Sequence, residues 1–174
     1  MSVTRASIEM LAAELGRALL RRRRIVTTAE SCTGGLVAGA ITSIAGSSEW
    51  FEQAFVTYGN EAKQALLHVP AKMLERHGAV SEPVARAMAK GALARSRADF
   101  AVAITGIAGP GGGSVEKPVG TVWFAFGGRR GPVSTLHRVF SGNRRAVRDQ
   151  SVAVALKLLI GIVKKSSPAT KARA

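Results

Sequence analysis

Segments of strand-like and helix-like character alternate along this 174-residue sequence. Short β-branched or small apolar runs indicate strands, and longer stretches with apolar residues three and four positions apart indicate helices. In chain order, the pattern predicts a helix, a strand, a helix, a strand, three helices, three strands and a final helix. Such alternation is typical of layered α/β domains, in which helices cover both faces of a sheet.

The predicted elements define one domain. The expected strands cover residues 25–29, 54–58, 100–105, 119–126 and 133–140. The expected helices cover residues 3–23, 34–44, 61–67, 71–77, 81–97 and 143–164. Asn60 is expected to be the N-cap of the third of these helices, and Asn143 the N-cap of the last. A glycine-rich turn joins the last two strands, so they form a hairpin with antiparallel pairing. We therefore expect a three-layer α/β/α fold with a mixed, mostly parallel sheet of about five strands over residues 1–165, and a disordered tail over residues 166–174.

Composition limits the class of protein. The hydrophobic fraction of 47% supports a buried core, and no apolar run reaches the roughly 18 residues that cross a bilayer. Glu9 and Glu14 interrupt the N-terminal segment, so a secretory signal is not expected. A single cysteine excludes an internal disulfide and fits a reducing compartment. We therefore expect a cytoplasmic protein that does not insert into membranes.

The formal net charge of +14 raises the question of a nucleic-acid partner. Much of the positive charge lies near the two ends of the chain, in Arg21–Arg24 and in residues 157–174. Aromatic residues make up only 5% of the sequence, and no basic–aromatic pattern predicts a base-stacking surface. The basic ends are therefore expected to attract nucleic acid only non-specifically.

The segment Ala-Glu-Ser-Cys-Thr-Gly-Gly over residues 29–35 is the first candidate for chemistry, because it lies between an apolar strand and a helix. Ser31 and Cys32 would stand where a helix offers unpaired N–H groups and the positive end of its dipole. A nucleophile and donors for an oxyanion could therefore lie side by side. The same position equally suits a helix cap formed by Ser31 or Thr33.

Tyr58 and Lys63 follow the second strand, and the carboxyl ends of parallel strands share one edge of a sheet. Lys63 could there accept the Ser31 proton, as in Ser–Lys enzymes that use no histidine. The lysine must be neutral for this role, which requires burial or nearby cations to lower its pKa. Tyr58 could relay the proton or orient Lys63. The alternative is that both are surface residues.

Two further segments could hold an anionic ligand. A Gly/Pro-rich loop over residues 106–118 follows the third strand and contains neither a Walker A motif nor a dinucleotide fingerprint. Its glycines allow close approach of the backbone to phosphate or sugar oxygens. Arg144 and Arg145 begin the last helix, where the dipole disfavours cations, so at least one is expected to grip an anion. A flexible connection and a solvated basic face are the respective alternatives.

Histidine and metal chemistry are not expected. His68, His77 and His137 are isolated along the sequence, and together with Cys32 they form no recognisable zinc-site spacing. No paired-carboxylate motif is present either. We therefore expect no metal site.

Five motifs in one order resemble the CinA carboxy-terminal domain, also called the nicotinamide-nucleotide amidohydrolase (PncC) family, over about residues 10–162. The motifs are Thr28–Gly35, Tyr58–Lys63, Ala79–Ser81, Thr105–Gly112 with Glu116–Thr121, and the helix start at Arg144 and Arg145. The resemblance implies a cofactor-free α/β/α domain, often a homodimer. It also implies hydrolysis of the carboxamide of nicotinamide mononucleotide to nicotinate mononucleotide and ammonia, in pyridine-nucleotide salvage. Many relatives carry a molybdopterin-binding-like domain before this one, and only the amidase part is expected here.

The resemblance also implies roles for single residues. Ser31 is implied as the nucleophile, with Lys63 and Tyr58 handling its proton. The residues expected to bind the substrate or the oxyanion are Cys32, Thr33, Gly34, Gly35, Thr105, Gly106, Gly109, Gly111, Gly112, Arg144 and Arg145. Two positions depart from the usual family pattern, namely Gly59, where serine is common, and Asn143, where aspartate is common. If that aspartate orients an arginine, the grip on substrate is weaker in this chain.

Two other functions remain compatible with the sequence. Cys32 could be the nucleophile of an amidase, with Glu30 or Glu61 and Lys63 as partners. Alternatively, a catalytically silent protein of DNA uptake or damage response could bind nucleic acid through its basic ends.

Overall fold

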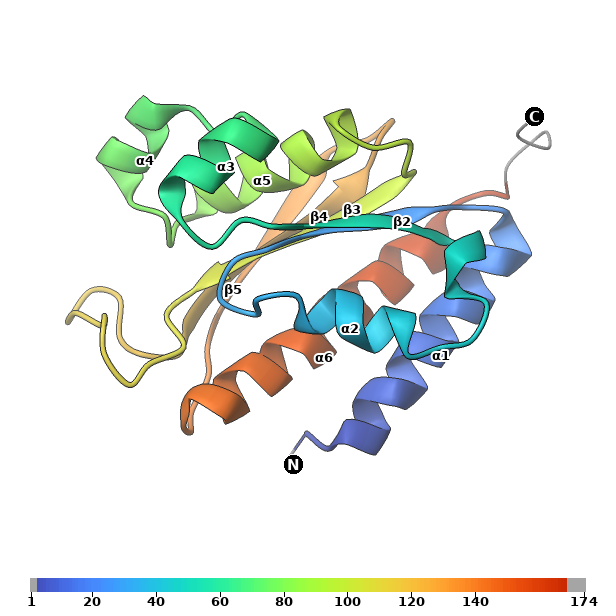
Figure 1. The fold of residues 1–174 in the computed structure, drawn as a ribbon, viewed down its shortest axis with the longest axis horizontal. Coiled ribbons are helices and arrows are strands. Elements are labelled where there is room, and N and C mark those ends of the chain that lie inside the picture. Colours follow the sequence, from blue (N-terminus) through green and yellow to red (C-terminus); the bar gives the residue numbers. More distant parts are fainter. Residues whose placement is uncertain (1–2, 169–174) are drawn as a thin grey trace.

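The computed structural model describes residues 3–168, which form three layers with a sheet between two sets of helices (Figure 1). The strands are β1 Val26–Glu30, β2 Phe51–Val56, β3 Phe100–Gly106, β4 Thr121–Gly128 and β5 Val133–Val139. The helices are α1 Arg5–Arg22, α2 Leu36–Thr42, α3 Asn60–Leu67, α4 Ala71–His77, α5 Glu82–Ala94, α6 Arg144–Lys165 and the short 3₁₀ helix η1 Ser47–Glu49. Residues 166–168 follow α6 without helix or strand, and the rest of the predicted tail lies outside the described residues.

The sheet has five strands in the order β2-β1-β3-β4-β5. β1 pairs in parallel with β2 and β3, whereas β4 pairs antiparallel with β3 and β5. The predicted mixed α/β sheet is thus confirmed, and β4 runs against the other four strands. Because β1, β2 and β3 are parallel, the turns after Glu30, Val56 and Gly106 lie at one edge of the sheet.

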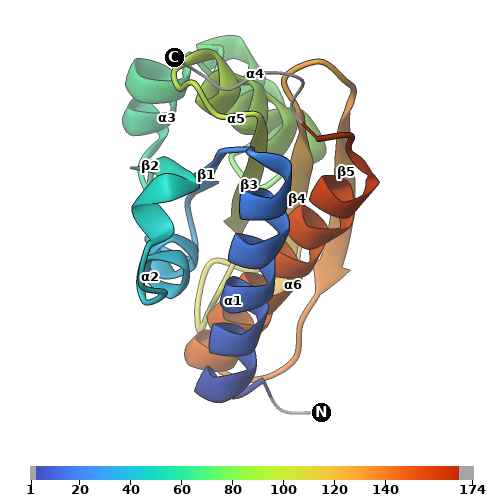
Figure 2. The ribbon, with the colours of Figure 1, turned by 90° about the vertical axis from the view of Figure 1, so that its right-hand side faces the viewer.

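β1 and β3 form the centre of the sheet and are covered on both faces. Every residue of β1 is buried, as is every residue of β3 before Gly106, which agrees with their uninterrupted runs of small and β-branched residues. Helices α1, α2 and α6 cover one face, and α3, α4 and α5 cover the other (Figures 1 and 2). α1 and α6 lie side by side in Figure 2, and Lys164 Nζ of α6 lies 2.6 Å from Glu14 Oε1 of α1.

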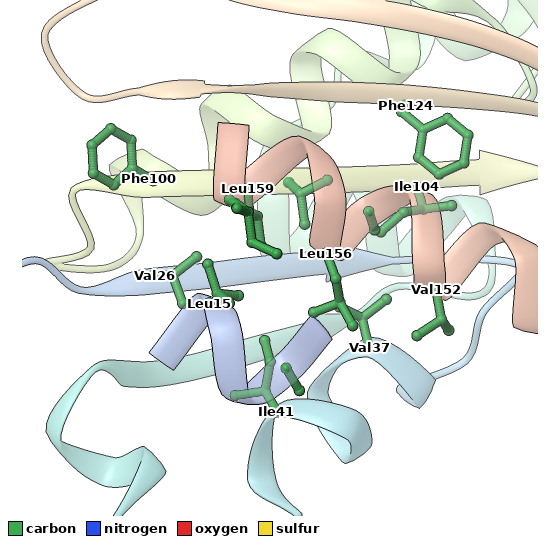
Figure 3. Close-up of a cluster of buried hydrophobic side chains, with 14 of the residues drawn as sticks. Leu15, Val26, Val37, Ile41, Phe100, Ile104, Phe124, Val152, Leu156 and Leu159 are labelled. Atoms are coloured by element: carbon green, nitrogen blue, oxygen red, sulfur yellow. The ribbon is translucent and has the colours of Figure 1, made fainter. Parts of the chain in front are cut away.

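An apolar cluster fills the space between the sheet and α1, α2 and α6 (Figure 3). Leu15 of α1, Ile41 of α2 and Leu156 and Leu159 of α6 are fully buried in it. Burial of each such side chain contributes about 1.5–3 kcal/mol to stability, so this cluster holds α2 and the turn before it against the sheet. A second cluster, which includes Met88, lies under α5 on the opposite face. Within residues 3–168, no helix has the length and apolar character needed to span a bilayer.

Two local expectations differ from the structure. β2 runs from Phe51 to Val56, so it begins three residues and ends two residues before the predicted bounds of 54–58. The expected N-cap of α3 was also wrong, because Gly59 takes that position without a side-chain hydrogen bond, and Asn60 is the first helical residue. At α6 the expected cap is present, since Asn143 Oδ1 accepts a hydrogen bond from the following helix.

Gly91 of α5 is a position where the fold has no room for a side chain. The backbone carbonyl group of Leu67, at the end of α3, occupies the space that a Cβ would need. We expect Gly91→Ala to lower the free energy of unfolding by about 1–3 kcal/mol, because α3 and α5 would have to separate. As a control, Gly161→Ala on α6 meets nothing within 4 Å and is expected to raise it by about 0.5–1 kcal/mol. Urea denaturation measures both, and equal effects would contradict the close approach at Gly91.

Candidate active site

A cavity of about 210 Å³ lies where β1, β2 and β3 end. Its lining residues are Ser31, Cys32, Tyr58, Lys63, Ala79, Val80, Thr105, Gly106, Ala108 and Arg144. Most of these are candidates from the sequence, and they come from the end of β3, from the segments that follow β1 and β2, and from the start of α6. Ala79 and Val80, from the turn between α4 and α5, and Ala108 had no predicted role. Thr105 Oγ1 donates to the Ala79 carbonyl at 2.9 Å and so holds that turn against β3.

Ser31 and Lys63 meet at the base of this cavity. The Ser31 amide donates to the Ile104 carbonyl at 2.9 Å, which extends the pairing of β1 with β3 and fixes the backbone of the serine. Lys63, in the second turn of α3, places Nζ 3.1 Å from Ser31 Oγ. Ser31 is 8% exposed and Lys63 is 1% exposed. The structure therefore brings the two side chains into direct contact in a site largely shielded from water.

The Lys63 amine is surrounded by oxygen acceptors. Nζ lies 2.9 Å from the Thr57 carbonyl oxygen and 3.1 Å from that of Tyr58. Among the ion pairs of the described residues, none involves Lys63. Burial lowers the pKa of Lys63 from its usual 10.5, because the charged amine loses its hydration, and the neighbouring Cys32 acts in the opposite direction. Burial therefore makes the neutral amine, which is the form that can accept a proton, easier to form than in an exposed lysine.

Glu30 holds the start of α2, which lies directly after the turn that carries Ser31. Oε2 accepts hydrogen bonds from the amides of Gly35 at 3.0 Å and Val37 at 3.1 Å, and Oε1 accepts from Ala38 at 2.9 Å. Thr28 Oγ1 adds a contact of 3.2 Å to Oε1, and the whole Glu30 side chain is buried. A carboxylate from the preceding strand therefore satisfies the first amides of the helix.

This arrangement overturns the expectation that Ser31 or Thr33 caps α2. Gly35 takes the N-cap position with a φ of 92°, a value that favours glycine, and it offers no side-chain cap. Because Glu30 already accepts from the helix start, the Ser31 hydroxyl is left to contact Lys63.

Cys32 also lines the cavity, but its environment disfavours a thiolate. The side chain is 5% exposed, and burial is the main cause that raises the pKa of the thiol to about 12. Since the thiolate is the nucleophilic form, a cysteine in this state is a poor nucleophile near neutral pH. Of the two acids considered as its partners, Glu30 is engaged with α2 and Glu61 is exposed on α3. The geometry favours Ser31 over Cys32.

Arg144 and Tyr58 meet across the mouth of the cavity. Arg144 Nη2 donates to the Tyr58 hydroxyl at 2.8 Å, and Nη1 donates to the Gly109 carbonyl at 2.8 Å. The Tyr58 hydroxyl therefore contacts Arg144, and it is the Tyr58 backbone carbonyl that reaches Lys63. No bridging hydroxyl is needed between Ser31 and Lys63, because these two side chains are in direct contact.

Several predicted site residues lie away from the cavity wall. They are Thr33, Gly34, Gly35, Gly109, Gly111, Gly112 and Arg145. Gly109 contributes through its contact with Arg144. Arg145 has a side chain that is 91% exposed, pairs with Asp149 at 3.7 Å and borders two surface hollows of about 430 and 520 Å³ on the far side of the α6 start. Of the two adjacent arginines, the structure thus places Arg144 at the cavity.

Two supporting residues were not identified from the sequence as parts of the site scaffold. Glu30 was considered only as a partner of Cys32, although a carboxylate placed before a Gly-Gly turn and a helix is a recognisable capping signal. Arg148 Nη2 donates to the Thr33 carbonyl at 2.9 Å and so holds the same turn from α6. Its signal was the spacing of four residues from Arg144, which places both arginines on one side of the helix. Within residues 3–168, no three His, Cys, Asp or Glu side chains are grouped to bind a metal.

Fold and site together define an α/β protein with a buried serine–lysine pair at the carboxyl edge of a mixed sheet. The model of the CinA C-terminal domain matches residues 8–163, and the chain belongs to that family. It is 58% identical over 157 residues to a protein of Escherichia coli strain K12 named nicotinamide-nucleotide amidohydrolase PncC, covering 90% of this chain and 95% of that protein. A Pseudomonas putida protein of the same name is 53% identical over 154 residues, covering 88% and 95%.

Solved structures show the same fold. The crystal structure of the competence/damage inducible protein CihA from Agrobacterium tumefaciens matches with a TM-score of 0.89 and 50% identity, covering 93% of this chain and 99% of that one. A CinA superfamily protein from Klebsiella pneumoniae matches with a TM-score of 0.87 and 40% identity, covering 91% and 99%. The sequence resemblance to the family is therefore confirmed.

Proposed function

We propose that the protein hydrolyses the carboxamide of nicotinamide mononucleotide to nicotinate mononucleotide and ammonia, a step of pyridine-nucleotide salvage. Relatives that are 58% and 53% identical over 95% of their own length carry the name of this activity. The observation that carries the proposal is the contact of 3.1 Å between the buried side chains of Lys63 and Ser31, from Nζ to Oγ, in the wall of the cavity. An amide bond needs a strong nucleophile, and a neutral lysine beside a serine supplies one.

The surroundings of Lys63 orient its lone pair. In the neutral amine, the two N–H groups can donate to the carbonyls of Thr57 and Tyr58, which accept only. The remaining lone pair then faces Ser31, the third neighbour of Nζ. Ser31 thus donates its proton to Lys63 as its Oγ attacks the amide carbon, and Lys63 serves as general base.

The reaction proceeds through two acyl transfers. The attack forms a bond from Oγ to the carbonyl carbon, and the Lys63 ammonium then gives its proton to the departing nitrogen, so that the C–N bond breaks and ammonia leaves. A water molecule next attacks the nicotinoyl ester while Lys63 takes its proton. Cleavage of the ester returns the proton from Lys63 to Ser31 and releases nicotinate mononucleotide. Every step uses side chains of this chain, backbone donors and water.

The size of the cavity suggests how the substrate lies. At about 210 Å³ it is smaller than the roughly 300–1,000 Å³ typical of pockets that enclose a whole small-molecule ligand. The carboxamide and its ring would therefore enter, between Ser31 and the wall formed by Ala79 and Val80. The ribose phosphate would remain at the mouth, near Arg144 and the Gly-rich loop. In this arrangement, Tyr58 orients Arg144 and borders the ring.

The direct test is ammonia release by the purified protein with nicotinamide mononucleotide, with product identification by mass. We expect equal amounts of ammonia and nicotinate mononucleotide. Free nicotinamide, which lacks the ribose phosphate that would face Arg144, is the control substrate and should turn over far more slowly. Absence of ammonia release from the nucleotide would contradict the proposed function.

The adjacent residues Arg144 and Arg145 allow a test variant and a control variant for the proposed binding of the substrate phosphate. Arg144 uses two of its five N–H donors on Gly109 and Tyr58, which leaves others for a phosphate. We expect Arg144→Gln to lower kcat/KM for the nucleotide by about 10- to 100-fold, mainly through KM. Arg145→Gln removes the same charge one residue away, outside the cavity, and should change kcat/KM by less than about twofold. Steady-state kinetics measures both, and equal losses would contradict the assignment to Arg144.

A further inference from the structure

Glu30 is a fully buried acid without a cationic partner among the ion pairs of residues 3–168. Its two oxygens instead accept from three backbone amides at the start of α2 and contact the Thr28 hydroxyl. All of these partners lie within eight residues of Glu30, and the turn that they enclose carries Ser31. Such a chelate of backbone donors fixes the path of the turn, because each bond constrains a different peptide unit.

The backbone amides from Ser31 to Ala38 differ in the acceptors to which they donate. The Ser31 amide donates to β3, and the amides of Gly34 and Leu36 donate to carbonyls within the turn. Glu30 accepts from the amides of Gly35, Val37 and Ala38. In the described part of the chain, the amides of Cys32 and Thr33 have no oxygen acceptor, and their only neighbouring acceptor is the Cys32 sulfur, which accepts hydrogen bonds weakly. These two amides directly follow the nucleophile, and Cys32 lines the cavity.

We infer that Glu30 is a positioning residue, which fixes the turn after Ser31 so that the amides of Cys32 and Thr33 form the oxyanion site. The inference deepens the proposed function and rests on Ser31 being its nucleophile. In acyl-transfer enzymes with a nucleophile on a strand-to-helix turn, the amide after the nucleophile is a usual oxyanion donor. A donor must be held in place before the charge develops, since its contribution depends on preorganisation.

Glu30 also makes some of the amides unavailable as donors to the oxyanion. A carboxylate at the start of α2 compensates the positive end of that helix and occupies its first donors. A developing oxyanion would therefore gain nothing from Gly35, Val37 or Ala38. Arg148 supports the same geometry from α6, because its bond to the Thr33 carbonyl fixes the neighbouring peptide. Glu30 itself does not line the cavity, so it acts on the reaction only through the turn.

The substitution Glu30→Gln tests this inference with little change in shape. A glutamine places an NH₂ group where one carboxylate oxygen accepted hydrogen bonds. Thr28 can accept from that NH₂ group at the Oε1 position, but the Ala38 amide then loses its acceptor. We expect kcat for nicotinamide mononucleotide to fall by about 10- to 100-fold with KM within about twofold, as for other supporting residues of active sites. Lys63 is untouched, so the pH dependence of kcat should keep its inflection.

A second readout does not depend on the amide substrate. Phenylmethylsulfonyl fluoride sulfonylates activated serines, and its rate of reaction with Ser31, followed by mass spectrometry, should fall in Glu30→Gln by about the same 10- to 100-fold factor. The matched control is Glu82→Gln. Glu82 lies in the first turn of α5 and contacts Arg86 and Thr135, none of which lines the cavity. The labelling rate and kcat of this variant should stay within about twofold of wild type.

The outcomes separate the inference from the proposed function. A folded Glu30→Gln protein with wild-type kcat and wild-type labelling would overturn the positioning role, as would a wild-type protein that is not labelled at Ser31. A wild-type protein that is labelled at Ser31 but releases no ammonia overturns the proposed function. In that case, the labelling rate of Glu30→Gln relative to wild type still tests the positioning role of Glu30. If Glu30→Gln does not fold, Thr28→Val removes one contact of the carboxylate and should slow labelling by about threefold. An unchanged rate in that variant would overturn the inference.

Discussion

Replacing Ser31 with alanine is expected to lower kcat/KM for nicotinamide mononucleotide by about 10⁴-fold or more, because the variant lacks the hydroxyl that forms the acyl-enzyme. The fold should persist, since within residues 3–168 the Ser31 Oγ has a single hydrogen-bond partner, Lys63 Nζ, and the backbone of Ser31 is held by β3. Ammonia release measures the loss, and the thermal unfolding midpoint of the variant checks that it is folded. A Ser31→Ala protein that keeps a tenth of the wild-type rate would contradict the assignment of the nucleophile.

Cys32→Ala is the companion experiment, because it removes the rival nucleophile from the adjacent position. The raised pKa of the buried thiol leads us to expect that this variant keeps most of the wild-type kcat. The reverse result, with Ser31→Ala active and Cys32→Ala inactive, would establish the cysteine route.

The second large effect is expected at Lys63. The substitution Lys63→Met keeps a flexible side chain of similar length and removes the base, so kcat/KM should fall by about 10²- to 10⁴-fold. In the wild type, kcat/KM should rise with pH as Lys63 loses its proton, with the inflection below 10.5, because burial lowers this pKa. The residual activity of Lys63→Met should lack that inflection. A wild-type profile that is flat over the same range would contradict the role of Lys63 as a base.

The lowered pKa of Lys63 also predicts how stability depends on pH. The unfolded chain holds the lysine proton up to about pH 10.4, whereas the folded chain releases it at a lower pH. Between these two pKa values the unfolded state binds more protons, so the free energy of unfolding rises with pH across that window. Below the folded pKa the buried charge costs its full penalty. Urea denaturation of wild type and Lys63→Met should show the rise in the wild type alone, and parallel pH curves would contradict it.

Much of the fold was predictable because it depends on short-range pattern. The buried run of β3 and the capped start of α6 at Asn143 are properties of neighbouring residues, and both elements appear close to where the pattern predicts them. The early start of β2 was not predictable, because its first residues are only half-buried at an edge of the sheet. There, pairing with β1 defines the strand more than its own sequence does.

The candidate site likewise has a part that could be predicted from the sequence and a part that could not. The sequence located Ser31, Tyr58 and Lys63 after two predicted strands, and a parallel pairing of those strands brings their ends together. The sequence could not separate Arg144 from Arg145, which share the start of one helix. The choice depends on a contact between Arg144 and Tyr58, which lie 86 residues apart in the chain.

By itself, the sequence determined the alternation of strands and helices, the family, and the turns in which polar and glycine residues gather. These features could be predicted because each depends on residues that are close together in the sequence. Only the tertiary structure decided that Lys63 is buried against Ser31, that Glu30 takes the donors of α2, and that the Tyr58 hydroxyl turns to Arg144. The physical reason is that the protonation of a lysine and the partners of a helix end depend on which atoms from distant segments exclude water there. Packing of the complete chain sets those neighbours.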